Sequence, residues 1–238
     1  MKSNFFLQTF TIAAVIALPM LTLFTACEGF LGPVGPPIGY HFNPDITYGS
    51  LTDSRDGKKY RTVQIGTQTW MAENLNYNAG GGSVCFNDKS SNCDRYGRLY
   101  NWATAMGLPS SCNSTSCANQ VQANHRGICP AGWHVPSDAE WTTLTNFVGS
   151  NAGTKLKARG GWYYESNGTD DFGFSALPGG YRYSDGDFDS AGNVGHWWSA
   201  TENDATDARG RYMNNYGSYA NEIWDYKAIQ LSLRCLQD

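Results

Sequence analysis

The seven cysteines constrain the fold of this chain more than any other feature of its sequence. Cys27 belongs to a separate motif described below, and the remaining even number indicates disulfides if the chain is exported. Two pairs of neighbouring cysteines flank short polar turns. This favours a local bond within each pair and leaves the last two cysteines for each other. We therefore expect the disulfides Cys85–Cys93, Cys112–Cys117 and Cys129–Cys235.

Metal binding and thiol catalysis are the alternatives for these cysteines. The sequence has no C-x-x-C, and none of its 4 histidines stands at a zinc-site distance from a cysteine. An oxidising compartment would also leave no obvious unpaired thiol to act as a nucleophile. A disulfide framework is therefore the better interpretation.

The N-terminal segment has the pattern of an export signal. Lys2 is the only charge before Glu28, and a mostly apolar run leads to the small residues Thr25 and Ala26. The segment resembles a bacterial lipoprotein signal, with Ala26 at the cleavage position and Cys27 as the lipidated residue. We expect residues 1–26 to be this signal, and Cys27 to anchor the protein in the bacterial cell envelope, at the outer membrane or cell surface. The alternative is an ordinary signal peptide with a chance cysteine.

The chain after Cys27 divides into a linker and a domain. Residues 28–44 are rich in Gly and Pro and show no helical or strand period, so we expect residues 27–52 to be a tether. The alternative is an arm packed on the domain. Residues 53–238 form the domain, and the 41% hydrophobic content suffices for a core. A net charge of −4 disfavours nucleic acid as a partner.

Local patterns in the domain predict an α+β fold, with two short helices packed on an irregular antiparallel sheet. We expect a hairpin over residues 60–75 and a helix over 96–106. A second helix follows the capping box of Ser137 and Glu140. Its expected apolar stripe consists of Trp141, Leu144, Phe147 and Val148. Short aromatic strands are expected at 161–164, 172–177, 181–183 and 197–201, and a long last strand at 228–235.

Several motifs of the domain occur together in one known family. They include residues 70–75 (WMAENL), 127–141 (GICPAGWHVPSDAEW), 172–182 (FGFSALPGGYR), 197–201 (WWSAT) and 233–235 (LRC). With them, residues 53–238 resemble the Fibrobacter succinogenes major paralogous domain, which occurs in exported proteins and lipoproteins. The resemblance implies a fold related to C-type-lectin-like and formylglycine-generating-enzyme-like domains, with Trp197 and Trp198 mainly in the core. The Cys112–Cys117 pair looks like a local addition to the family pattern.

Aromatic and acidic side chains near polar loops are the candidate ligand contacts. Aromatic faces beside Asn and Asp suit sugar stacking, although the same rings could fill the core of a small sheet. The alternating carboxylates at 185, 187 and 189 resemble one side of a calcium site, and solvated carboxylates are the simpler interpretation. The candidate ligand-binding residues are Trp162, Tyr163, Tyr164, Tyr183, Asp185, Asp187 and Asp189, with Tyr181 beside them.

The sequence contains none of the common catalytic motifs, and the resemblance supplies no catalytic residue. We therefore expect no enzymatic activity and no cofactor beyond the calcium candidate. The favoured hypothesis is a surface lipoprotein with a lectin-like-fold binding domain, whose ligand is a glycan or a protein. One alternative is a structural or adhesive envelope component without a small-ligand site. Another is a degenerate relative of formylglycine-generating enzymes, which free thiols would support.

Overall fold

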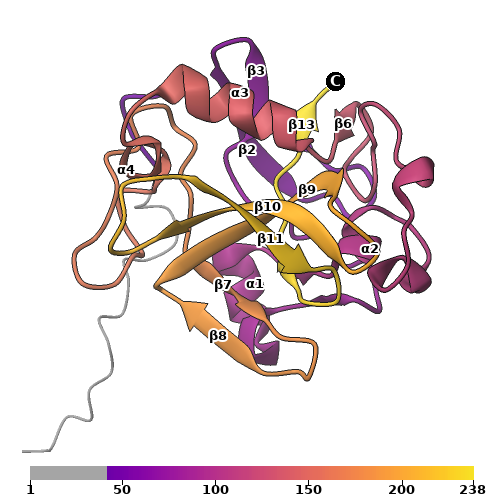
Figure 1. The fold of residues 1–238 in the computed structure, drawn as a ribbon. Helices are drawn as coiled ribbons and strands as arrows, with labels where there is room; N and C mark the ends of the chain where they lie inside the picture. The colour runs from indigo at the N-terminus through magenta and orange to yellow at the C-terminus, as the bar shows by residue number, and fades with distance from the viewer. Residues whose placement is uncertain (1–41) are drawn as a thin grey trace, which may run out of the picture. The chain divides into compact units, whose positions relative to one another are not determined.

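Two sheets and a separate hairpin organise residues 42–238, the part of the chain that the computed structural model describes (Figure 1). The five-stranded sheet has the order β1 (Gly49–Thr52), β2 (Lys59–Ile65), β3 (Gln68–Met71), β13 (Leu236–Gln237), β6 (Trp133–His134). The six-stranded sheet has the order β11 (Asn221–Tyr226), β10 (Asp207–Asn214), β9 (Val194–Glu202), β12 (Leu231–Ser232), β5 (Leu99–Tyr100), β4 (Ser83–Val84). The hairpin consists of β7 (Gly179–Arg182) and β8 (Phe188–Ala191).

Short helices connect these strands, which confirms the α+β class with antiparallel sheets. The helices are α1 (Ser90–Tyr96), α2 (Trp102–Ala105), α3 (Asp138–Val148) and α4 (Ala152–Leu156), with 3-10 turns at Phe86–Asp88, Ser110–Asn113 and Ala118–Gln120. The structure thus has more helices than the two expected. Its disulfides are the three expected pairs, with sequence separations of 8, 5 and 106 residues.

The first described residues belong to the domain. Strand β1 pairs antiparallel with β2, and the side chains of Phe42, Ile46 and Tyr48 pack against the core. Asn43 Nδ2 donates to the carbonyl oxygen of Asp170 over 2.9 Å. Residues 42–52, which we expected within the tether, are therefore packed on the domain. Cys27, the signal of residues 1–26 and the rest of the tether lie outside the described residues.

Helix α3 begins and ends as its sequence predicts. Ser137 Oγ accepts from the amide of Glu140 over 3.3 Å, and Glu140 Oε2 accepts from the amide of Ser137 over 2.8 Å. The helix packs along β9 and β10 (Figure 1). Three residues of the expected stripe are buried, but Phe147 is 57% exposed and contacts the ring of Phe172. Phe147 therefore lies at the edge of the buried face, outside the core.

The helix expected over residues 96–106 is wrong for most of its length. Helix α1 ends at Tyr96, because Gly97 adopts a φ of 76° that a helix cannot continue. Leu99 and Tyr100 then form β5, which pairs with β12 and β4. Only α2 is helical, and its N-cap is Asn101. The apolar spacing in this segment reflects burial in a sheet as well as in a helix.

The last segment connects the two sheets. Strand β12 joins the six-stranded sheet and β13 joins the five-stranded one. Of the single strand expected over 228–235, only Leu231 and Ser232 are in a strand, and β13 begins after that range. The expected alternation is also absent, because Gln230, Ser232 and Arg234 are buried like their apolar neighbours. These polar residues are buried because the segment passes from the six-stranded sheet to the five-stranded sheet.

Asn74 satisfies the buried guanidinium of Arg234. Its Oδ1 accepts from Arg234 Nη2 over 2.9 Å and from Trp197 Nε1 over 2.8 Å. The guanidinium also lies 4.2 Å from the ring centre of Phe174. Burial lowers the pKa of Arg234 to about 9, because desolvation disfavours the charged form. This cluster fixes the C-terminal segment against the core.

The C-terminal half differs most from the sequence-based prediction. Residues 161–164 and 172–177 form no strand, whereas 181–183 and 197–201 fall mainly in β7 and β9. Trp197 and Trp198 are fully buried, as expected. The long hairpin of β10 and β11 was not predicted. Within residues 42–238, no helix has the length and apolarity needed to cross a bilayer.

Candidate functional site

A cleft of about 530 Å³ lies between the β7–β8 hairpin and strands β9, β10 and β11. Figure 1 shows the β7–β8 hairpin below β10 and β11 in this view, and the hairpin packs against β9. Four tyrosines dominate the lining, and we call this site the tyrosine cleft. Its lining consists of Tyr181, Tyr183, Ser184, Asp185, Val194, His196, Tyr212, Ile223, Asp225, Tyr226 and Ile229.

Strand periodicity places these side chains in the cleft. Residues two apart on a strand share a face, and Val194 with His196, and Ile223 with Asp225, are such pairs. The antiparallel register places Tyr212 of β10 directly opposite His196 of β9. One face of the sheet therefore supplies most of the wall, and the hairpin closes the other side.

The rings in the cleft form a continuous series of contacts. The ring centres of Tyr181 and Tyr183 are 5.1 Å apart and the rings are perpendicular, at 90°. The rings of Tyr181 and His196 are 6.2 Å apart at 88°, and those of His196 and Tyr212 are 6.0 Å apart at 57°. Tyr183 is 43% exposed, so part of its ring is open to a ligand.

Hydrogen bonds hold the hairpin side of the cleft. The Tyr181 hydroxyl lies 3.0 Å from the Tyr183 hydroxyl and donates to Asp189 Oδ2 over 3.3 Å. Burial, followed by the contact with Tyr183, raises the pKa of Tyr181 above 10.0. Its phenol is therefore neutral at physiological pH and provides a hydrogen-bonding group with an apolar ring.

A His–Asp pair lies on the sheet side. His196 Nε2 is 2.8 Å from Asp225 Oδ2, with side-chain exposures of 7% and 21%. The contact does not have the angles of a hydrogen bond, and neither atom has another hydrogen-bond partner within residues 42–238. The pair is thus a buried polar contact with unused hydrogen-bonding capacity.

Two of the seven candidate residues, Tyr183 and Asp185, line the tyrosine cleft. Trp162 is only 4% exposed and its Nε1 donates to the carbonyl of Ala176 over 3.0 Å, so it belongs to the core. Tyr163 and Tyr164 contact each other outside the lining of this cleft, at a centre distance of 6.3 Å. The aromatic cluster expected at 162–164 is therefore not part of the site.

Two of the three carboxylates of the calcium candidate, Asp185 and Asp189, have separate partners. Asp185 Oδ1 accepts from the amide of Asp187 over 3.2 Å. Asp189 accepts from the amide of Ser190 and from the Tyr181 hydroxyl. Across residues 42–238, no group of three or more His, Cys, Asp or Glu side chains is arranged to hold a metal ion.

Sequence reasoning did not find His196, Tyr212, Asp225 and Tyr226. The hairpin of β10 and β11, which supplies three of them, was not recognised. Its signal was available, because Glu222, Trp224 and Tyr226 alternate with Ile223 and Asp225. The alternation within a single strand does not show which of its two faces packs against another element.

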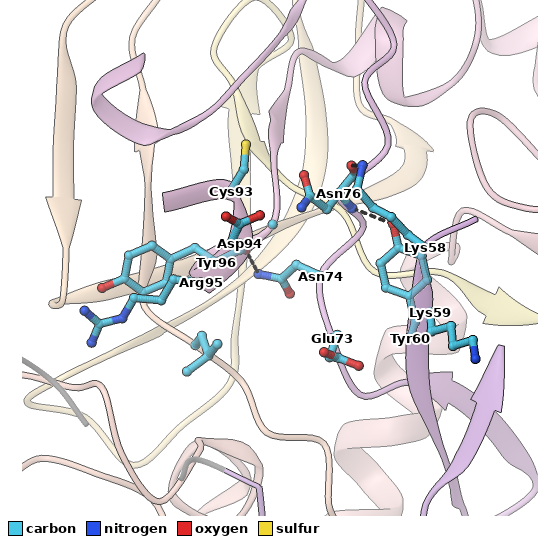
Figure 2. A pocket seen from close by; sticks show the side chains of 12 residues that line it. Lys58, Lys59, Tyr60, Glu73, Asn74, Asn76, Cys93, Asp94, Arg95 and Tyr96 are labelled. Atoms are coloured by element: carbon cyan, nitrogen blue, oxygen red, sulfur yellow. Dashed lines mark hydrogen bonds between the residues drawn. The ribbon is translucent and has the colours of Figure 1, made fainter. Parts of the chain in front are cut away.

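A second cleft, of about 250 Å³, lies between β2 and α1 (Figure 2). Figure 2 shows Lys58, Lys59 and Tyr60 on one side and the α1 residues on the other. Lys58 Nζ already contacts Asp56 Oδ2 at 2.9 Å, and the tyrosine ring on this side is 4% exposed. This cleft offers mixed charge and little open aromatic surface, so the tyrosine cleft is the stronger candidate.

The fold and site define a disulfide-stapled α+β domain with an aromatic cleft. The family model of the Fibrobacter succinogenes major domain matches residues 63–237. The chain belongs to this family, as its motifs indicated. Comparison with curated proteins gave no match, and comparison with solved structures gave none.

Proposed function

We propose that this protein is a lipid-anchored component of the bacterial cell envelope whose domain binds a glycan in the tyrosine cleft. The observation that carries the proposal is the open ring of Tyr183, which lies in one cleft with Asp185 and Asp225. Sugars bind through CH groups stacked on aromatic faces and through hydroxyls that donate to carboxylates. The cleft offers both kinds of contact.

Binding, and not catalysis, is proposed for two reasons. Within the described residues, the Ser184 hydroxyl of the cleft makes no hydrogen bond to His196, Asp185 or Asp225, so no base is placed to activate it. Cys235, the cysteine nearest to the family's C-terminal motif, is bonded to Cys129. A copper site of the formylglycine-generating type would need that thiol.

The anchor is a separate part of the proposal. Acylation of Cys27 would place the domain at a membrane surface, at the outer membrane or outside the cell. Mass spectrometry of the mature protein tests this directly. The expected N-terminal residue is an acylated Cys27, and an unmodified Cys27 would contradict the anchor without affecting the cleft.

Glycan binding is tested with the mature protein in detergent, first on a glycan array and then by calorimetry on the best ligand. Tyr183→Ala removes the open ring of the cleft, and one stacking contact corresponds to about two- to tenfold in affinity. Tyr216→Ala is the matched control, because Tyr216 is 87% exposed and does not line the cleft. Equal loss in both variants, or no ligand on the array, would refute the proposal.

A further inference from the structure

The charge of the tyrosine cleft has one sign. Its lining contains the carboxylates Asp185 and Asp225, and no Lys or Arg of the described chain takes part. The cations nearest in sequence have other partners. Arg182 donates to Gly186 O and to Gln230 Oε1, and Lys227 Nζ lies 3.2 Å from Glu202 Oε2. An incoming cation therefore meets no competing positive charge in the lining.

Each carboxylate keeps one oxygen without a hydrogen bond from residues 42–238. Asp185 Oδ1 accepts from the amide of Asp187, which leaves Oδ2 free. Asp225 Oδ2 faces His196 Nε2, and Asp225 Oδ1 takes no hydrogen bond from the described residues. A neutral hydroxyl can use these acceptors, but an ammonium group gains a charge-assisted hydrogen bond as well.

The rings add a second preference for positive charge. Tyr181 is perpendicular to both Tyr183 and His196, so neighbouring rings form the corners of a box. Aromatic faces attract cations through the ring quadrupole, and boxes of this kind recognise ammonium groups. Tyr212 and Tyr226 line the same cleft. Rings and carboxylates therefore favour the same ligand charge.

We propose that the tyrosine cleft selects a saccharide that carries a positively charged amine, an amino sugar with a free ammonium group. This inference rests on the proposed glycan binding and specifies its ligand. The ammonium group lies among the tyrosine rings and donates to Asp185 and Asp225, while the pyranose ring stacks on Tyr183.

The test compares three β-1,4-linked tetrasaccharides that differ only in the group at carbon 2. These are oligomers of glucosamine, N-acetylglucosamine and glucose, titrated into the mature protein by calorimetry where the amine is protonated. The glucosamine oligomer should bind about tenfold tighter than the other two, as expected for one cation–π contact with added charge-assisted hydrogen bonds.

Variants of the carboxylates identify the source of the preference. Asp185→Asn and Asp225→Asn should each weaken binding of the glucosamine oligomer severalfold more than binding of the glucose oligomer, and so reduce the preference. Asp171→Asn is the matched control, because Asp171 is exposed and does not line the cleft. Thermal melting shows whether each variant folds. If Asp225→Asn does not fold, the Asp185→Asn variant still tests the preference, because Asp185 is exposed. An unchanged preference in a folded Asp185→Asn variant would argue against the assignment.

The outcomes separate this inference from the proposed function. Equal binding of all three oligomers would overturn the ammonium preference and leave glycan binding intact. If no oligomer binds, the amino-sugar inference is overturned, and the glycan array decides separately whether the cleft binds another glycan.

Discussion

The disulfide Cys129–Cys235 closes a loop with a sequence separation of 106 residues, compared with 5 for Cys112–Cys117. In the loop-entropy model, closing the long loop contributes about 4.7 kcal/mol to the free energy of unfolding, and closing the short one about 2 kcal/mol. All four of these cysteines are at least 97% buried, so loss of packing is similar for both pairs. Removing the long bond by Cys129→Ala with Cys235→Ala should therefore cost about 2.7 kcal/mol more than removing the short one.

The assay is urea unfolding of both double variants and the parent protein, followed by tryptophan fluorescence. The parent protein contains 8 tryptophans, so the signal is strong. The structure adds a reason for a large effect, because Cys235 stands between β12 and β13, which join the two sheets. If both pairs cost the same free energy, the loop argument is refuted. The disulfides would then act through local packing alone.

Two further predictions concern buried polar groups. His134 lies 3.0 Å from Glu140 Oε1 and 2.8 Å from Asp238 Oδ1. Desolvation lowers its pKa, but the two carboxylates together outweigh it and raise the pKa above 6.5. The contribution of His134 to the free energy of unfolding is therefore complete below about pH 6.5, and it is lost as the pH rises through the pKa of the folded state. In urea unfolding, His134→Gln should reduce the free energy of unfolding more near pH 5.5 than near pH 8.5. An equal cost at both pH values would contradict this. Asn74→Ala should cost roughly 3 kcal/mol or more by the same assay, because it leaves the Arg234 cation buried without its main acceptor. A cost below about 1 kcal/mol would show that the carbonyl oxygen of Phe174, which also accepts from the guanidinium, and the surrounding rings suffice to stabilise the cation.

The parts of the fold that could be predicted depend on neighbours in sequence. The hairpin of β2 and β3 follows from alternation and a turn at Gly66, and α3 follows from its capping box. The disulfides follow from counting, because two local pairs leave one remaining pair. The long last strand was wrong because alternation predicts burial on one face only, whereas Ser232 and Arg234 are enclosed on the other face by a second layer.

The site was only partly predictable because four separated segments, on β7, β9, β10 and β11 and the loops that follow β7 and β11, build it. Three of them carry an i, i+2 pair visible in the sequence, such as Tyr181 with Tyr183 or Ile223 with Asp225. A strand pattern shows which residues share a face, but it does not show whether that face meets solvent, core or another strand. Trp162 illustrates this, since its ring stands beside polar loop residues in the sequence and is nevertheless buried. The pairs on β9 and β11 come together because both strands pair with β10, and β7 adds its pair by packing against β9; such long-range contacts leave no local trace in composition.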